Sequence, residues 1–326
     1  MANLLSSLLM GSIALLGSTQ PPAELAGVAA PDAARVVLED VETAPPEAPA
    51  VVEAPAVVEA PAVAPPAATV TRDAPVYVMS EVGMVYVPTT WKPRPDGTFD
   101  LVVHFHGTPG AVKKALDTAG VDAVLVIVNL GLGSGPYESR YQHKAALDAV
   151  VKVAERTLIK SHLMADPHVG RIALSSWSAG YGAVWRLLMR PDVSARVDAV
   201  LLADGLHSAF MPQGHRTIDG AHIAAFQRFA EQATRGERLM TVTHSGIETY
   251  TYASTTETAR YLERVVGAEA TTMSDVIGTR GMKRTSHAER GSFVVDGYAG
   301  ENADAHCDHL LALGETMYPA LAKRWK

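Results

Sequence analysis

Cysteine is nearly absent from this sequence of 326 residues, since Cys307 is its only one. A single cysteine cannot form a disulfide within the chain, so the sequence excludes a disulfide-stapled fold. It leaves the compartment open, because a protein without disulfides can also function in an oxidising compartment. With 48% hydrophobic residues, the chain is apolar enough to bury a large core without such cross-links.

An excess of positive charge is also missing. The net charge is −7, and residues 1–72 carry most of it, with eight acidic and only two basic side chains. The rest of the chain is therefore nearly neutral. A nearly neutral domain has no electrostatic attraction to nucleic acid or to an anionic membrane, so we expect neither as a partner.

No apolar segment is long enough to predict a transmembrane span. Residues 4–17 (LLSSLLMGSIALLG) are apolar, but their length suits the core of a secretory signal. The positive start typical of such signals is absent, because no Lys or Arg precedes Arg35. We expect residues 1–20 to be a signal peptide and the protein to be exported to the periplasm, the envelope or the medium. The alternatives are a misassigned start or an amphipathic tail on a cytoplasmic protein.

Residues 21–73 lack the large side chains that a folded core requires. Between residues 47 and 68 the unit VVEAPA recurs every six residues. Proline at that spacing prevents both a helix and a central strand. We therefore predict an extended, acidic linker over residues 21–73, followed by a folded domain over residues 74–326.

The folded part alternates apolar strands with helical patterns. Such alternation predicts an α/β fold with a mostly parallel sheet and helices on both faces. In such sheets, reactive side chains gather at the carboxyl ends of the strands. Two edge strands with a turn at Gly83 are expected over 75–88, and buried strands over 99–107, 121–131, 169–176, 197–205, 238–246 and 291–300. Helices are expected over 138–160, 182–190, 223–233, 257–267 and 308–325, and a solvated excursion over 278–291.

Ser178 stands at a sharp corner between the strand 169–176 and the following helix. Its neighbours Ser176, Ala179, Gly180 and Gly182 are all small, as so tight a corner requires. The corner raises the hydroxyl above the sheet, where a base can reach it. The N–H of Ala179 opens the helix and points the same way, so it can stabilise an oxyanion.

This corner resembles the nucleophile elbow of the α/β-hydrolase superfamily, whose motif is Gly-x-Ser-x-Gly. Here Ser176 replaces the first glycine, whereas Gly180 keeps the second. The resemblance covers residues 75–326 and implies an α/β-hydrolase fold with Ser178 as the nucleophile. The alternative interpretation is a helix that is capped by a serine after a buried strand.

The stretch HFHGTPG carries a second feature of that superfamily, an oxyanion loop that often contains His-Gly. The resemblance implies that the backbone N–H of Thr108 is the second oxyanion donor, beside that of Ala179. We expect His106 to anchor this loop by a hydrogen bond. His104, on the same face of the strand, is expected to be a hydrogen-bonded core residue.

The superfamily places its catalytic histidine after the last strand, just before the last helix. His306 lies at that junction, and His309, inside the following helix, is the fallback. Cys307 is not expected to be catalytic, because neighbours at a helix start point to different sides.

The third member of a triad is an acid that orients the base. The usual place for this acid, the loop after the strand 238–246, has no Asp but carries Glu248. The preceding strand ends at Asp204, followed by Gly205, and some lipases of the superfamily keep their acid there. We favour Asp204, with Glu248 as the alternative acid. Asp204 could instead serve only as a turn residue.

Several histidines near these strand ends permit a metal interpretation. The possible ligands are His104, His106, Asp204, His207 and His244. No HExxH or CxxC pattern supports a metal, so we expect neither a metal nor another cofactor.

The sequence thus predicts a serine hydrolase that cleaves carboxylic esters of small molecules through an acyl-enzyme on Ser178. An amidase or peptidase with the same triad is the nearest alternative. A non-catalytic binding protein of the same fold is the other, because fold does not fix function. Few long insertions interrupt the strands and helices, so no large lid is expected. The oligomeric state leaves no sign in the sequence.

Overall fold

The computed structural model describes residues 72–213 and 215–326. The predicted signal peptide and residues 21–71 of the predicted linker lie outside the described residues. Within the described part, no helix is both long and apolar enough to cross a membrane.

The described residues form one twisted sheet of mixed direction, whose order is β1-β2-β4-β3-β5-β6-β7-β11-β10-β8, with β9 paired to β10. The six strands from β4 to β11 run parallel, whereas β1 and β2 at one edge and β10 and β8 at the other are antiparallel. The strands are β1 Val76–Met79, β2 Met84–Val87, β3 Thr98–Phe105, β4 Val124–Val128, β5 His168–Trp177, β6 Val197–Ala203, β7 Leu239–His244, β8 Ala270–Thr272, β9 Val276–Ile277, β10 Met282–Arg290 and β11 Phe293–Tyr298.

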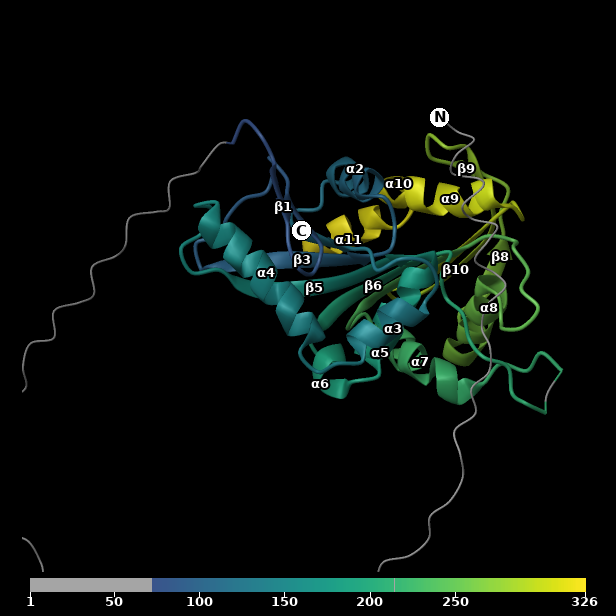
Figure 1. Cartoon of the computed structure of the whole chain (residues 1–326). Helices are drawn as coiled ribbons and strands as arrows, with labels where there is room; N and C mark the ends of the chain where they lie inside the picture. The colour runs from purple at the N-terminus through teal and green to yellow at the C-terminus, as the bar shows by residue number, and fades with distance from the viewer. Residues whose placement is uncertain (1–71, 214) are drawn as a thin grey trace, which may run out of the picture. The chain divides into compact units, whose positions relative to one another are not determined.

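Helices cover both faces of the sheet (Figure 1). Helices α2, α9, α10 and α11 lie on one face, and α3 to α8 lie on the other. The helices are α2 Pro109–Ala119, α3 Gly135–Tyr141, α4 Ala146–Lys160, α5 Tyr181–Leu188, α6 Pro191–Ser194, α7 Gly220–Thr234, α8 Thr255–Val266, α9 Ala303–Leu311, α10 Leu313–Thr316 and α11 Tyr318–Trp325. The sequence predicts this layered arrangement correctly, and the chain has the α/β-hydrolase fold.

The parallel strands are buried on both faces, which explains their unbroken apolar sequences. Every residue of β4 and β7 is buried, and seven of the eight residues of β3 are. Burying an apolar side chain stabilises the fold by roughly 1.5–3 kcal/mol, so these runs specify the centre of the sheet.

Two predicted helices are broken in the structure. The helix expected over 138–160 divides into α3 and α4, because residues 142–145 are all exposed and no apolar face holds them to the core. The helix expected over 308–325 divides into three. Gly314 lies so close to α2 that a Cβ there would be 2.8 Å from Ala115, and Pro319 begins a new helix in α11.

The excursion predicted over 278–291 is wrong, because most of it forms β10. This strand pairs antiparallel with β11 and with β8. Its side chains are mostly polar and only Met282 and Ala288 are buried, so the sequence carries no clear apolar alternation. The backbone pairing, which the sequence does not display, decides the conformation.

Candidate active site

The backbone turns sharply at Ser178. This residue directly follows β5 and has φ 51°, the left-handed region that ordinary residues rarely adopt. A short 3-10 turn, η1 (Ser178–Gly180), then leads into α5. A Cβ on Gly180 would lie 2.1 Å from the carbonyl oxygen of Phe105, so only glycine fits there.

The hydroxyl of Ser178 does not cap the helix. No side-chain cap occurs at η1 or at α5, and Ser178 Oγ makes no hydrogen bond with residues 72–213 and 215–326. Ser176, which replaces the first glycine of the motif, has a buried hydroxyl without a partner in the same part of the chain. The structure therefore contradicts the alternative interpretation of Ser178 as a helix cap.

The next strand, β6, brings Asp204 beside this turn. Asp204 also has a positive φ of 42°, and the following Gly205 packs directly on the elbow. A Cβ on Gly205 would lie 2.3 Å from the oxygen and 2.6 Å from the nitrogen of Ser178. Two adjacent corners with positive φ thus pack the backbone after β6 directly against that of Ser178.

The carboxylate of Asp204 is buried and accepts two hydrogen bonds. Its Oδ1 accepts the N–H of Ser245 at 2.9 Å, and its Oδ2 accepts the Nδ1–H of His306 at 2.7 Å. Burial alone would raise the pKa of Asp204. The hydrogen bond from His306, the neighbouring histidine charges and the Ser245 amide more than offset burial and lower it. The carboxylate therefore stays ionised and holds His306 in one tautomer.

His306 lies in the first turn of α9, which Asn302 caps by accepting the N–H of Ala305 at 2.9 Å. Since Nδ1 donates to Asp204, the neutral ring carries its lone pair on Nε2, the atom that can accept a proton. Its side chain is 16% exposed. Among the described residues Nε2 has no hydrogen-bond partner, and neither has Ser178 Oγ.

The indole of Trp177 connects the serine corner to this histidine. Its Nε1–H donates to the backbone carbonyl of His306 at 2.9 Å, and the two rings lie 4.7 Å apart between centroids. Ser178 is the next residue along the chain. Serine–histidine hydrogen bonds are often loose without substrate, so a free Ser178 Oγ is compatible with a nucleophile and its base.

The backbone N–H groups of Thr108 and Ala179 are the two predicted oxyanion donors. The two amides before Thr108 are already engaged. The N–H of His106 donates to Val128 O and that of Gly107 to Asn129 Oδ1, both at 2.9 Å. In the described part of the chain, the N–H of Thr108 donates no hydrogen bond. The N–H of Ala179, at the helix start, has no acceptor within its helix. Strands β3 and β5 are parallel neighbours, paired up to their carboxyl ends. Thr108 and Ala179 follow these two strands in the chain, so their N–H groups lie at the same edge of the sheet.

The histidines of β3 behave as the sequence predicts. His104 is fully buried, with Nδ1 2.9 Å from Ser175 Oγ and Nε2 2.9 Å from the carbonyl of His106. His106 anchors the loop through Nδ1, 2.8 Å from Tyr137 Oη. Burial, then the charge of His306, lowers the pKa of His106 to about 4. Its ring is therefore neutral near pH 7.

The fallback base His309 lies in the core. It is 1% exposed, and its Nδ1 is 2.8 Å from Thr243 Oγ1. Burial lowers its pKa to about 4. Among residues 72–213 and 215–326 the histidine hydrogen bond to Asp204 is made by His306, so the structure brings His306 and not His309 to this carboxylate.

Glu248 and Cys307 are not brought into the hydrogen-bonded group. Glu248 is exposed in the loop after β7 and makes no hydrogen bond with the described residues. Cys307 is half-buried, and burial raises the pKa of its thiol. A thiol held in its protonated form is a poor nucleophile.

Two of the possible metal ligands bind protein atoms through Nδ1. His207 Nδ1 is 3.1 Å from the carbonyl of Ala253, and His244 Nδ1 is 3.0 Å from Thr256 Oγ1. Within the described ranges, no three His, Cys, Asp or Glu side chains form a group that could hold a metal ion.

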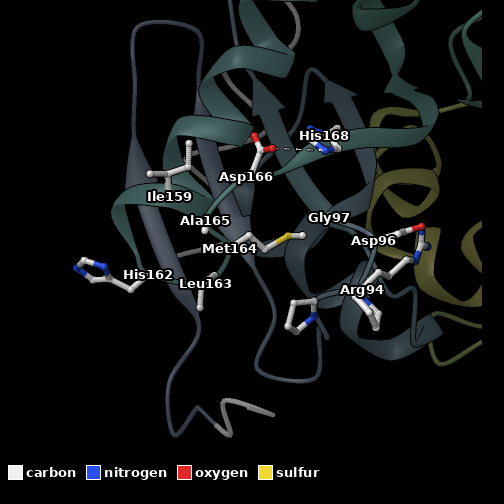
Figure 2. Close-up of a pocket in the computed structure, with 12 residues that line it drawn as sticks. Arg94, Asp96, Gly97, Ile159, His162, Leu163, Met164, Ala165, Asp166 and His168 are labelled. Carbon is white, nitrogen blue, oxygen red and sulfur yellow. Dashed lines mark ion pairs between the residues drawn. The ribbon is translucent and has the colours of Figure 1, made fainter. Parts of the chain in front are cut away.

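A pocket of about 680 Å³ lies at the opposite edge of the sheet (Figure 2). Residues 93–97, 159, 162–166 and 168 line it, at the amino ends of β3 and β5, and His168 and Asp166 form an ion pair of 3.9 Å there. Its lining contains no serine, threonine or cysteine. Without a nucleophile it does not compete with the Ser178 corner as a candidate active site.

Sequence reasoning missed three groups of this site. Trp177 packs on His306, Ser245 donates to Asp204, and Tyr137 holds His106. The Ser245 contact comes from a backbone amide, which any residue but proline supplies. Trp177 was visible beside Ser178, but its partner lies 129 positions later in the chain.

No protein-family model matches the chain, and no curated protein does. Among solved structures, LpqC, a poly(3-hydroxybutyrate) depolymerase from Bordetella parapertussis, is 15% identical, with a TM-score of 0.41 over 74% of this chain and 87% of that one. Thermogutta terrifontis esterase 2, phosphonylated by sarin, is 16% identical, with a TM-score of 0.39 over 73% and 92%. A cold-adapted esterase from an Arctic intertidal metagenomic library is 12% identical, with a TM-score of 0.37 over 77% and 93%. These likenesses are weak, so the fold assignment rests on the strand order.

Proposed function

We propose that this protein is a serine hydrolase that cleaves carboxylic esters through an acyl-enzyme on Ser178. The observation that carries the proposal is the 2.7 Å hydrogen bond between Asp204 and His306, formed beside a strained corner whose serine hydroxyl makes no hydrogen bond with the described residues. An acid, a base and a nucleophile in this arrangement are the components of acyl transfer.

In the proposed reaction, Nε2 of His306 takes the proton of Ser178 while Oγ attacks the ester carbonyl. The backbone N–H groups of Thr108 and Ala179 bind the oxyanion that forms. His306 then gives its proton to the departing alcohol, which leaves an ester of Ser178. Water, deprotonated by His306, attacks this acyl-enzyme. His306 then returns that proton to Ser178 Oγ as the acyl–oxygen bond breaks, which releases the carboxylic acid and the free serine. Asp204 stabilises the imidazolium at each step.

Covalent labelling tests the nucleophile. A fluorophosphonate probe should modify the folded wild-type protein at one site, identified by peptide mass as Ser178, and should leave Ser178→Ala unmodified. Ser194→Ala is a matched control on α6, away from the site, and should label like the wild type. Absence of labelling in folded wild-type protein would favour the non-catalytic alternative.

The substrate class is tested by turnover. A series of p-nitrophenyl esters of rising chain length, beside matching p-nitroanilides, compares esterase with amidase activity. We expect the esters to be cleaved faster, and faster anilide cleavage would favour an amidase or peptidase. A chelator should leave turnover unchanged, whereas loss of turnover that added metal restores would favour a metal-dependent hydrolase.

We also propose that the protein is exported, because residues 4–17 have the composition and length of a signal core. Amino-terminal sequencing of protein from the fractionated native host would test this. A mature chain that starts near residue 20 in an exported fraction is expected, and an intact chain in the cytoplasm would contradict it.

A further inference from the structure

The side chain of Trp177 is buried at the carboxyl end of β5 and touches the histidine proposed as the base. It is 8% exposed. Its Nε1–H donates to the backbone carbonyl of His306, at 2.9 Å, in the first turn of α9. Its ring lies 4.7 Å from the His306 ring with an angle of 33° between the planes. One residue thus holds both the backbone and the ring of His306.

These contacts complement the hydrogen bond from His306 to Asp204. That bond fixes one edge of the imidazole but leaves the ring free to tilt about it. The indole packs against the ring and restricts the tilt. A base that is held in one orientation loses less entropy when it accepts a proton, so this packing favours productive geometry.

The indole also provides a negative electrostatic face. His306 becomes a cation when it accepts the serine proton, and an aromatic face attracts a cation within about 6 Å, tryptophan most strongly. The contact at 4.7 Å is inside that range. The attraction exists only while His306 is charged, so it acts on the charged steps of the reaction and not on the resting state.

The other groups around His306 do not supply the same effect. Burial lowers the pKa of His106 and of His309 to about 4, and that of His207 as well, so these rings are neutral near pH 7. Asp204 is the carboxylate bonded to the ring. On α9 itself, the charged neighbours are Asp304 and Asp308, of which Asp308 pairs with Arg280.

We propose that Trp177 is a positioning residue for His306, which holds the imidazole on Asp204 and favours its protonated form through the face of the indole. This inference rests on the proposed function, in which His306 is the base. Trp177 would thus act in two ways. Its Nε1–H holds the backbone of α9 at His306, and the face of its indole stabilises the charged imidazole.

The chain contains a matched control. Trp185 on α5 donates its Nε1–H to the carbonyl of His222 at 3.0 Å, and the two rings lie 4.3 Å apart at the same angle of 33°. This tryptophan–histidine pair has the same hydrogen bond and a similar ring contact but lies outside the proposed triad. The two indoles differ in their second neighbour: Trp177 also stacks on the His106 ring, 5.1 Å between centroids, whereas the Arg186 guanidinium lies 4.1 Å over Trp185. The variant Trp185→Leu therefore measures how much the loss of such packing lowers the stability of the fold, without a change at the proposed triad.

The experiment compares Trp177→Leu, Trp177→Phe and Trp185→Leu in the full chain. Histidines carrying ¹³C at Cε1 are titrated by NMR, with the His306 signal assigned through His306→Gln. The pH profile of kcat/KM for a p-nitrophenyl ester and the melting temperature are measured in parallel. The NMR arm needs no turnover, so it remains informative if the proposed function fails.

We expect Trp177→Leu to move the titration midpoint of His306, and the acid limb of the kcat/KM profile, down by about half a pH unit. Its plateau kcat/KM should fall on the order of tenfold. Trp177→Phe keeps a weaker aromatic face, so its midpoint should lie between those of the wild type and Trp177→Leu, while kcat/KM falls because the N–H bond to α9 is lost. Trp185→Leu should change only the melting temperature.

The proposal is overturned if Trp177→Leu folds and leaves the His306 midpoint where it is in the wild type. Equal losses of kcat/KM in Trp177→Leu and Trp185→Leu would also overturn it, since both would then be structural. If Trp177→Leu does not fold, Trp177→Met is the aliphatic variant on which the same outcomes are judged. Wild-type protein that neither labels nor turns over refutes the proposed function instead.

Discussion

Replacing Asp204 by asparagine removes one charge from the site with almost no change in shape. The new Oδ1 can still accept the Ser245 N–H at 2.9 Å. The amide NH₂ would face Nδ1 of His306 across 2.7 Å, where the carboxylate now accepts. Two donors cannot share that contact, so His306 must present its lone pair at Nδ1 and carry its proton on Nε2. In that tautomer it cannot accept the proton of Ser178.

The size of the effect follows from this switch of tautomer. In triads, a substitution of this type lowers kcat by about 10⁴-fold, which corresponds to roughly 5 kcal/mol in the barrier at about 1.36 kcal/mol per tenfold. Asp204 is 4% exposed, so bulk water does not reach the site easily and cannot replace the lost acceptor. We therefore expect the full loss rather than a partial one.

The assay is the kcat of p-nitrophenyl acetate hydrolysis at neutral pH, with Glu248→Gln as the matched control. Glu248 is exposed and makes no hydrogen bond with the described residues, so its substitution should change kcat by less than about twofold. Circular dichroism and a melting curve verify that both variants are folded. A greater loss in Glu248→Gln than in Asp204→Asn would refute the assignment of the acid.

Three further predictions concern stability and the surroundings of the site. Burial lowers the pKa of His104 to about 3 and that of His309 to about 4, so the unfolded chain binds protons that the folded protein does not. Stability that is fully present above pH 6.5, the usual histidine value, should fall as the pH decreases towards 4, and a melting temperature at pH 5 as high as at pH 7.5 would contradict this. Gly205→Ala places a Cβ 2.3 Å from the oxygen of Ser178, so we expect a lower melting temperature and a loss of kcat of at least about 100-fold, and wild-type turnover would disprove the close packing. Cys307→Ser should keep kcat/KM within about twofold of the wild type, since a thiol whose pKa is raised is not a nucleophile, and inactivation in a folded variant would contradict that.

The central strands along the chain and the position of the serine corner could be predicted because both depend on neighbours in the sequence. An unbroken apolar run such as residues 121–131 is buried on both faces wherever it is placed in a sheet, and it forms β4. Small residues around Ser178 permit a tight turn, and the structure has that turn. The breaks at residues 142–145 and at Ala312 could not be predicted, because they depend on what lies opposite in the core.

The sequence by itself determined the α/β layering and a short set of candidates, Ser178, two histidines and two acids. Only the tertiary structure decided which acid faces which histidine. Asp204 and Glu248 both follow strands that end at the same edge, and His306 and His309 lie three residues apart on one helix. The choice depends on the direction of each side chain in space. After the parallel strands β6 and β7, Asp204 faces His306 of α9, whereas His309 lies in the core and Glu248 is exposed.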